Sequence, residues 1–288
     1  MESKGLTLSF IIDAQSANYG ESIGNVSSLK KFTRFDGNQY TYISRQALRY
    51  NIVNQLGWDN TKVINNQVVQ FHPEATIIDY PEIDLFGYMK TISKKDENTA
   101  GGSTIRSAVC RLSNAVSLTP FESDVDFLNN MGLSKRINEN NALAQSEIHD
   151  SLYTYTVTID LDSVGIDNDL EIPNTEKAKR VKDLLKTLQY LYRDIRGRRE
   201  KLSPIFVIGG IYDRKNPFFE NSLKLKKDKL NVELIKSVLC DEEISKNTKV
   251  GYIKGFFEND SEIIEELNTK EISNFFNDLG TQVDEFYK

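Results

Sequence analysis

Cysteine and histidine are scarce in this chain of 288 residues, and each shortage excludes a class of protein. The two cysteines, Cys110 and Cys240, lie far apart and form no CxxC pattern, so no disulfide framework is expected. The two histidines, His72 and His149, stand in no HxxxH or HExxH pattern, which argues against a zinc site and against histidine-based nucleophilic catalysis. We therefore expect no metal site and no catalytic residues.

Long apolar runs are also absent. No stretch reaches the length of a membrane span, and the N-terminus MESKGLTLSFIIDAQ lacks the layout of a signal peptide. Neither a P-loop nor a GxGxxG motif is present, so no nucleotide cofactor is expected. These patterns predict a cytoplasmic protein with no membrane contact and no cofactor.

Positive charge is in deficit overall, because the net charge is −6 and the isoelectric point is near 5.2. A free nucleic-acid-binding domain is usually basic. The charge is uneven, however. Residues 30–49 hold five basic residues and one acidic residue, and residues 177–201 hold ten basic and three acidic residues. Residues 258–288 reverse the balance, with two basic and nine acidic residues. These segments are either one basic surface beside an acidic C-terminus or the solvated faces of ordinary helices.

Hydrophobic periodicity predicts an α+β protein that forms one domain over residues 1–288. Strand-like patterns occupy residues 6–12, 40–43, 84–92, 105–118, 152–161, 205–212 and 249–257. Helical patterns occupy residues 44–56, 176–196 and 261–277, the first with Ser44 as a good N-cap. The segment 119–150 is polar and irregular and interrupts the strand pattern.

The segment 160–171 resembles a calcium-binding loop, with acids at its first and third positions and Glu171 at its twelfth. Val164 at the fifth position cannot bind a cation, and a strand precedes the segment where an EF-hand needs a helix. The pattern is therefore typical of a turn from a strand to a helix.

The start of the helix at Ser44 carries the strongest chemical pattern. A helix N-terminus presents unpaired N–H groups and partial positive charge, which suit a phosphate. Arg45 and Arg49 lie one turn apart on a common face. The loop before the helix adds three more cations: Lys30, Lys31 and Arg34. The alternative, a capped helix with arginines facing solvent, stays open at this point.

Four segments together resemble a known family. They are LTLSFIIDAQSANYGE, YISRQALRYNI, DLFGYM and TIRSAVCRLSNAVSLTPFESDVDFLNN. In order and spacing they resemble the backbone subunit of Cascade-type CRISPR complexes, in the type I-B branch known as the DevR or autoregulator group. The segments spread over roughly the first 130 residues, and their order is more specific than any one of them.

The resemblance implies a modified ferredoxin-like (RRM-like) palm with an inserted thumb and finger-like loops. Its sheet would use residues 6–12, 84–92, 105–118, 152–161 and 205–212, and its helices residues 44–57 and 176–196. The thumb would be residues 119–151, and residues 13–39 and 58–83 would be loop or finger insertions. The aromatic octamer of ordinary RRM proteins is missing, so base stacking on the sheet is not expected.

The resemblance further implies a physical mechanism rather than a chemical one. Copies of the subunit would polymerise along the crRNA, grip its phosphates, and present its bases for pairing with a target DNA strand. The expected partners are crRNA, the target strand through the guide, further copies of the chain, and the cap and large subunits of Cascade. The residues expected to contact RNA are Asn18, Tyr19, Lys30, Lys31, Arg34, Ser44, Arg45, Gln46, Arg49, Arg106, Arg111, Lys135 and Arg136. Arg106 and Arg111 are five apart, so on one strand they would face opposite ways.

Two alternative functions remain. Related backbone subunits of type III complexes cleave RNA with an aspartate in the loop after the first strand. Here the loop SIGNVSSLKK has no aspartate, and Glu21 and Asp36 only flank it. We therefore expect the chain to have no nuclease or other enzymatic activity. The other alternative is an autoregulator that binds DNA or protein, but no helix-turn-helix pattern is evident.

Overall fold

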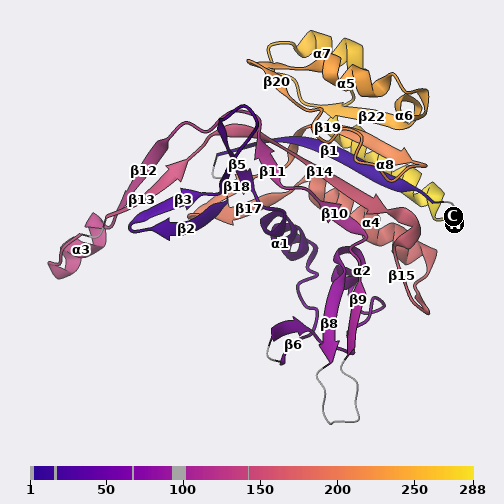
Figure 1. Cartoon of the computed structure of the whole chain (residues 1–288), viewed down its shortest axis with the longest axis horizontal. Coiled ribbons are helices and arrows are strands. Elements are labelled where there is room, and N and C mark those ends of the chain that lie inside the picture. Colours follow the sequence, from indigo (N-terminus) through magenta and orange to yellow (C-terminus); the bar gives the residue numbers. More distant parts are fainter. Residues whose placement is uncertain (1–2, 16–17, 67, 93–101, 142) are drawn as a thin grey trace.

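The computed structural model describes residues 3–15, 18–66, 68–92, 102–141 and 143–288. Its centre is an eight-stranded antiparallel sheet in the order β22-β19-β1-β14-β11-β5-β4, with β10 also paired to β14. These strands are β1 (Gly5–Ala14), β4 (Lys31–Thr33), β5 (Gln39–Ile43), β10 (Cys110–Leu112), β11 (Ala115–Ser117), β14 (Ser151–Asp160), β19 (Pro204–Tyr212) and β22 (Thr248–Tyr252). The chain is therefore a mixed α/β protein, drawn in Figure 1.

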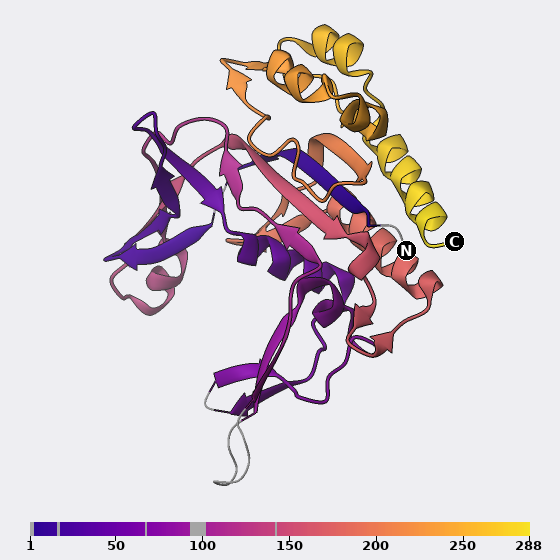
Figure 2. The same cartoon turned by 45° about the vertical axis from the view of Figure 1, so that its right-hand side comes forward.

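Three helices cover one face of this sheet: α1 (Arg45–Leu56), α4 (Asn174–Gln189) and α8 (Ile272–Phe286). Figure 2 shows α8 lying beside α4. Alternate residues of β1, from Leu6 through Leu8 to Phe10, pack with all three helices in one apolar core. Burial of this face removes large apolar side chains from water and is the main source of the sheet's stability.

The opposite face is covered only near β19 and β22. There α5 (Val232–Leu239), α6 (Glu242–Asn247) and α7 (Asp260–Leu267) form a C-terminal layer. A second core joins this layer to the sheet, and Ile11 of β1 contributes to it. Over β14, β10 and β11, no helix among the described residues covers this face.

Two projections leave the sheet through its connections (Figure 1). We call the first the thumb: β12 (Asp124–Asn129), α3 (Met131–Ile137) and β13 (Leu143–Ile148), with β13 pairing in parallel with β3 (Val26–Leu29), and β3 with β2 (Tyr19–Ile23). The second, the fingers, contains β6 (Val63–Asn66), β7 (Val68–Phe71), α2 (Pro81–Phe86), β8 (Tyr88–Ile92) and β9 (Gly102–Arg106). Short hairpins complete the fold: β15 (Ile166–Asp167) with β16 (Leu170–Glu171), β17 (Tyr192–Ile195) with β18 (Arg198–Lys201), and β20 (Leu225–Lys226) with β21 (Lys229–Leu230).

The helix expected after Ser44 is confirmed. The Ser44 Oγ accepts a hydrogen bond from the Ala47 amide at 3.3 Å, and Gly57 ends the helix with φ 65°. Both are common devices at helix ends. The strands expected at 6–12, 40–43, 152–161 and 205–212 are confirmed as β1, β5, β14 and β19. None of the helices in the described residues is long and apolar enough to cross a membrane.

Some sequence expectations are wrong. Residues 84–92 are not a palm strand, because 84–86 end α2 and β8 pairs only with β9 in the fingers. The helix expected to reach residue 196 ends at Gln189, because Arg196 and Gly197 both adopt positive φ and turn the chain into the β17–β18 hairpin. The acidic helix expected over 261–277 is two helices, α7 and α8, separated at Asn268 with φ 46°.

The insertions are more regular than their polar sequences predicted. Residues 13–39 hold β2, β3 and β4, and residues 119–151 hold a β-hairpin tipped by α3. Positions 16, 17, 67 and 142 of these insertions lie outside the described residues. The segment 160–171 is a turn between strand and helix, as expected, and its acids pair with cations of the chain: Asp160 with Arg111, Asp162 with Lys215 and Glu171 with Lys177.

A buried ionic cluster joins the fingers to α4. The Asp84 carboxylate of α2 accepts from Arg106 at 2.7 Å, from Arg180 of α4 at 2.9 Å and from the Gly165 amide at 2.9 Å. The Asp84 side chain is fully buried and both guanidinium groups nearly so. Each buried charge therefore has its partner, as burial requires.

Candidate nucleic-acid interface

The uncovered face of the sheet forms a groove of about 710 Å³. Its floor follows from the alternation of β14: Tyr153, Tyr155 and Val157 point into the helical core, so the residues between them face the other way. Thr154, Thr156 and Thr158 thus line the groove together with Ser113 and Val116 of the neighbouring segment. The floor is a stripe of hydroxyl groups with small apolar side chains.

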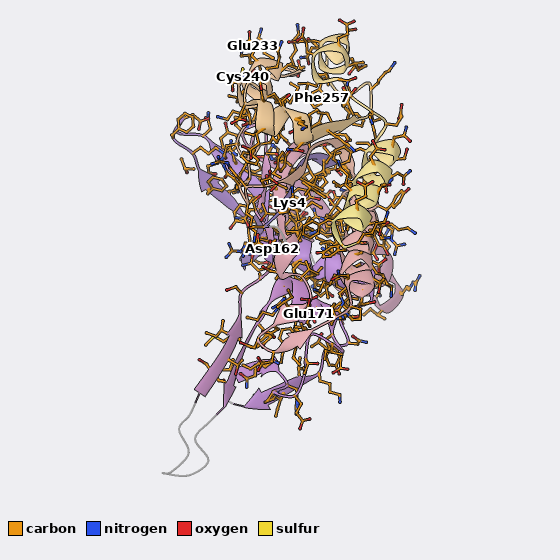
Figure 3. The ribbon with its side chains drawn as sticks, turned by 90° about the vertical axis from the view of Figure 1, so that its right-hand side faces the viewer. Lys4, Asp162, Glu171, Glu233, Cys240 and Phe257 are labelled. Atoms are coloured by element: carbon orange, nitrogen blue, oxygen red, sulfur yellow. The ribbon has the colours of Figure 1, made fainter. Side chains whose placement is uncertain are left out.

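Four cations and two carboxylates line this groove, so its lining carries a net positive charge on an acidic protein. The cations are Arg34, Arg45, Arg111 and Lys215, and the carboxylates are Asp160 and Glu220. Arg111 donates to Asp160 at 2.8 Å and keeps half of its side chain exposed. Lys215 pairs with Asp162, which Figure 3 places in the middle of the molecule, below the C-terminal layer.

Three of the residues predicted to contact RNA meet at this groove: Arg34, Arg45 and Arg111. They come from the turn after β4, the start of α1 and β10, which the sheet order brings together. Arg34 lies 4.3 Å from the centre of the Tyr40 ring and Arg45 is exposed. Within the described part of the chain neither has a carboxylate partner, so both remain available to an anion.

The start of α1 is a weaker phosphate cradle than the sequence predicted. The Asn114 side-chain oxygen accepts a hydrogen bond from the Arg45 amide at 2.9 Å, and the Ser44 Oγ accepts one from the Ala47 amide. Ser44 is buried and donates through its hydroxyl to the Asn18 side chain at 2.6 Å. These contacts occupy the amides of Arg45 and Ala47 from within the protein, so Asn18 and Ser44 shape the site instead of facing it.

Lys31 and Tyr19 hold the thumb in place. The Lys31 ammonium contacts both carboxylate oxygens of Glu147 at 2.7 Å and lies 4.3 Å from the centre of the Phe121 ring. The Tyr19 hydroxyl donates to the Glu147 carbonyl at 3.1 Å, and the Lys30 amide donates to the Asn18 carbonyl at 2.7 Å. Since strand side chains alternate, β4 directs Lys31 to the thumb and Phe32 to the groove.

Arg49 and Arg106 lie away from the groove. Both line a separate hollow of about 770 Å³ in the fingers, so Arg45 and Arg49 do not form one cradle. Arg49 is 3.5 Å from Glu82, and Arg106 is buried against Asp84 and the Ile166 carbonyl. The geometry therefore argues against the predicted RNA contact of Arg106, whose guanidinium already donates four hydrogen bonds within the protein.

The remaining predicted residues are exposed. Gln46 faces solvent on α1, and Lys135 and Arg136 lie in the last turn of α3 at the tip of the thumb. Of the ten basic residues in segment 177–201, Lys177, Arg180 and Arg193 are buried beside acids, whereas the other seven are partly or fully exposed. None of the ten is among the residues that line the groove.

Sequence reasoning missed the floor of the groove and its far wall. The alternation Tyr-Thr-Tyr-Thr along β14 was the available signal, since it predicts one aromatic face and one hydroxyl face. No sequence pattern indicated that Lys215 and Asn114 line the groove. Both lie in connections between strands, and tertiary packing decides where those connections run.

Two ionisable groups near the groove have shifted pKa values. The hydrogen bond from the Tyr40 hydroxyl, at 2.7 Å, and that from the Asn38 amide lower the pKa of Asp36. Burial lowers the pKa of His149, whose Nδ1 lies 2.7 Å from the Thr41 hydroxyl at the base of the thumb. Both side chains therefore form hydrogen bonds with neighbouring residues of the protein.

Comparisons with known proteins agree with this architecture. Residues 6–233 match the family model described as CRISPR-associated negative auto-regulator DevR/Csa2. A Myxococcus xanthus (strain DK1622) protein described as CRISPR-associated protein Cas7/Cst2/DevR is 29% identical over 122 residues; the match covers 38% of this chain and 40% of that protein. The two are therefore alike over less than half of the relative's length.

Two solved structures resemble the whole chain in fold. A chain of a CRISPR RNA-guided surveillance complex, described as pre-nicking, superposes with a TM-score of 0.61 at 11% identity, covering 97% of this chain and all of the other. A chain of another CRISPR RNA-guided surveillance complex gives a TM-score of 0.57 at 12% identity, covering 95% and 99%.

Proposed function

This chain belongs to the DevR/Csa2 family of CRISPR-associated proteins, and we propose that it is the crRNA-binding backbone subunit of a type I CRISPR surveillance complex. In this role several copies line up along the guide RNA, each holding its sugar-phosphate chain. The guide bases stay available to pair with a target DNA strand, so base pairing reads the sequence and the protein reads the backbone.

The groove over β14 is the observation that carries this proposal. Its rim of arginines supplies charge-assisted hydrogen bonds to phosphates, and its hydroxyl floor suits the sugar. The acidic charge lies elsewhere, with nine acids and two lysines in residues 258–288. A net charge of −6 is therefore compatible with RNA binding, because only the groove has to be positive.

A ferredoxin-like palm is the fold assignment that we attach to this function. The chain order β1, α1, β10, β14, α4, β19 and the neighbour order β19-β1-β14-β10 support it. So does the packing of α1 and α4 on one face of the sheet. The thumb and fingers are then insertions into the connections of the palm.

Contact between successive copies is supported by apolar side chains that the single chain leaves exposed. On the thumb they are Phe127, Leu128, Met131, Leu133, Ile137 and Leu143. On the fingers they are Val63, Val68, Val69, Met89 and Ile105. Clustered apolar surface of this kind marks contact sites in proteins, and further copies of the chain fit the proposed assembly.

We further propose that the chain is not a nuclease. Asp36, an acid flanking the loop where related subunits place a catalytic aspartate, has both carboxylate oxygens in hydrogen bonds within its own turn. In the described residues no group of three or more His, Cys, Asp or Glu side chains could hold a metal ion.

The proposed function predicts that the purified chain binds single-stranded RNA and assembles along it at a regular spacing. Binding is measured by fluorescence anisotropy at a fixed salt concentration, and assembly by electron microscopy on RNAs of increasing length. Regular cuts in a complementary RNA with magnesium would favour the nuclease alternative. Preferential binding to the promoter duplex of its own gene would favour the regulator.

Shortening the thumb is expected to reduce assembly more than single-site binding. Replacing residues 128–144 by an Asn-Gly turn keeps the base of the hairpin, where Asp126 pairs with Ser146, and suits a two-residue hairpin loop. The change removes most of the exposed apolar thumb and both Lys135 and Arg136. We expect loss of regular assemblies, an affinity for one-site RNA within about threefold of the wild type, and an unchanged melting temperature; full-length assembly by this variant would contradict the role of the thumb.

A further inference from the structure

The floor of the groove contains two threonine hydroxyls without a partner in the described part of the chain. Thr156 is buried, and its hydroxyl lies 2.8 Å from the Ser9 hydroxyl. Thr154 and Thr158, two residues to either side, are partly exposed on the same face. Unlike the Thr156 hydroxyl, the hydroxyls of Thr154 and Thr158 form no hydrogen bond in the described part of the chain.

The strand register explains why these two hydroxyls stay unpaired. Thr154 has Ile11 of β1 on one side and Val116 of β11 on the other, and neither side chain can form a hydrogen bond. Thr158 lies between Thr7 of β1, whose hydroxyl donates to the Asn216 carbonyl at 3.2 Å, and Arg111 of β10, whose guanidinium donates to Asp160 at 2.8 Å. Polar groups in a groove that lack an internal partner are satisfied by water or by a ligand.

The floor also lacks the means to bind bases by stacking. Tyr155 is among the residues that line the groove, but its ring is buried in the helical core and stacks on Phe10, and the Tyr153 ring belongs to the same core. Phe32, exposed at the rim, is the other aromatic residue in the described lining of the groove. Recognition on this floor therefore falls on the sugar and phosphate. A threonine hydroxyl both donates and accepts, as does the ribose 2′-hydroxyl, which DNA does not have.

We infer that Thr154 and Thr158 hydrogen-bond the 2′-hydroxyls of the bound strand and so select RNA over DNA. The inference rests on the proposed function, since it names what the same groove recognises in its ligand. The two threonines are four residues apart along β14, roughly 13 Å in an extended strand, so they contact riboses of different nucleotides. The arginines hold the phosphates of either strand, whereas the threonines distinguish the sugars.

The test compares oligo(U) with oligo(dU) of equal length, which differ only in the 2′-hydroxyl. The wild type is expected to bind oligo(U) about tenfold more tightly, as two neutral hydrogen bonds of ordinary strength would give. Replacing both residues, Thr154→Val with Thr158→Val, keeps their shape and is expected to remove this difference by weakening oligo(U) alone. The matched control, Thr154→Ser with Thr158→Ser, keeps both hydroxyls and is expected to retain most of the preference.

The possible results distinguish a failure of this inference from a failure of the proposed function. Equal affinity of the wild type for the two oligonucleotides would overturn the selection of RNA, and so would an equal loss for both in the valine variant. Either result leaves the phosphate grip standing. Binding of neither oligonucleotide by a folded wild type would overturn the inference and the proposed function together.

Discussion

Replacing Arg34 and Arg45 together by glutamine is expected to weaken RNA binding about 100-fold while leaving the fold intact. Both arginines line the groove, and neither has a carboxylate partner in the described part of the chain. Their replacement therefore leaves no carboxylate of the protein without its ion-pair partner. A charge-assisted hydrogen bond contributes about 1.5 kcal/mol or more, and two such losses correspond to about two factors of ten in affinity.

The salt dependence of binding gives a second reading of the same variant. Each phosphate contact with a single strand adds about 0.7 to the slope of log affinity against log salt. Loss of two contacts should therefore reduce the slope by about 1.4. Affinity is measured by anisotropy at several salt concentrations, and the melting temperature confirms folding.

A matched control separates the groove from overall charge. Lys179→Gln with Lys186→Gln removes the same net charge from exposed positions of α4, which packs on the opposite face of the sheet. We expect this control to bind RNA within about twofold of the wild type, because charges beyond a Debye length from the strand are largely screened. Equal effects of the two variants would mean that the groove is not the RNA-binding surface.

The Asp84→Asn variant is expected to lose about 3–5 kcal/mol of unfolding free energy. The carboxylate of Asp84 is the shared partner of Arg106 and Arg180 inside the protein. Without its charge, two buried guanidinium groups face each other with less compensation, which is the costly way to break a buried ion pair. The loss should lower the melting temperature by roughly 10 °C, as thermal unfolding followed by circular dichroism measures.

The control for Asp84 is the same substitution at an exposed ion pair. Asp194 contacts Arg199 at 2.8 Å with both side chains mostly in solvent. Asp194→Asn is expected to leave the melting temperature nearly unchanged, because exposed pairs contribute little. A similar shift in both variants would show that the cluster at Asp84 has no special structural role.

The parts of the fold that could be predicted from sequence are those with a local cause. The cap at Ser44 and the strand at 152–161 depend on adjacent residues, and both predictions are confirmed. Pro81 followed by Glu82 was a local signal for the start of α2, and reading it would have removed residues 84–92 from the list of palm strands.

The charged residues of the site were harder to predict, because a count of charges does not show which charged groups are buried and which lie at the surface. Arg180 and Arg106 contributed to the basic appearance of the sequence but are buried against Asp84, which lies 96 and 22 residues away from them. Arg34, Arg45 and Arg111 look no different in the sequence. The sheet order alone brings these three to one groove.

The central position of β1 has a consequence for how the protein is made. This strand pairs with β14 and β19 on its two edges, so its backbone groups are not all paired until residue 212 has left the ribosome. At about 5–20 residues per second this interval lasts roughly 10–40 seconds. During it, the nearly uninterrupted apolar segment GLTLSFIIDA is exposed to other nascent chains, and its protection at that stage depends on chaperones or on slow synthesis, not on the finished sheet.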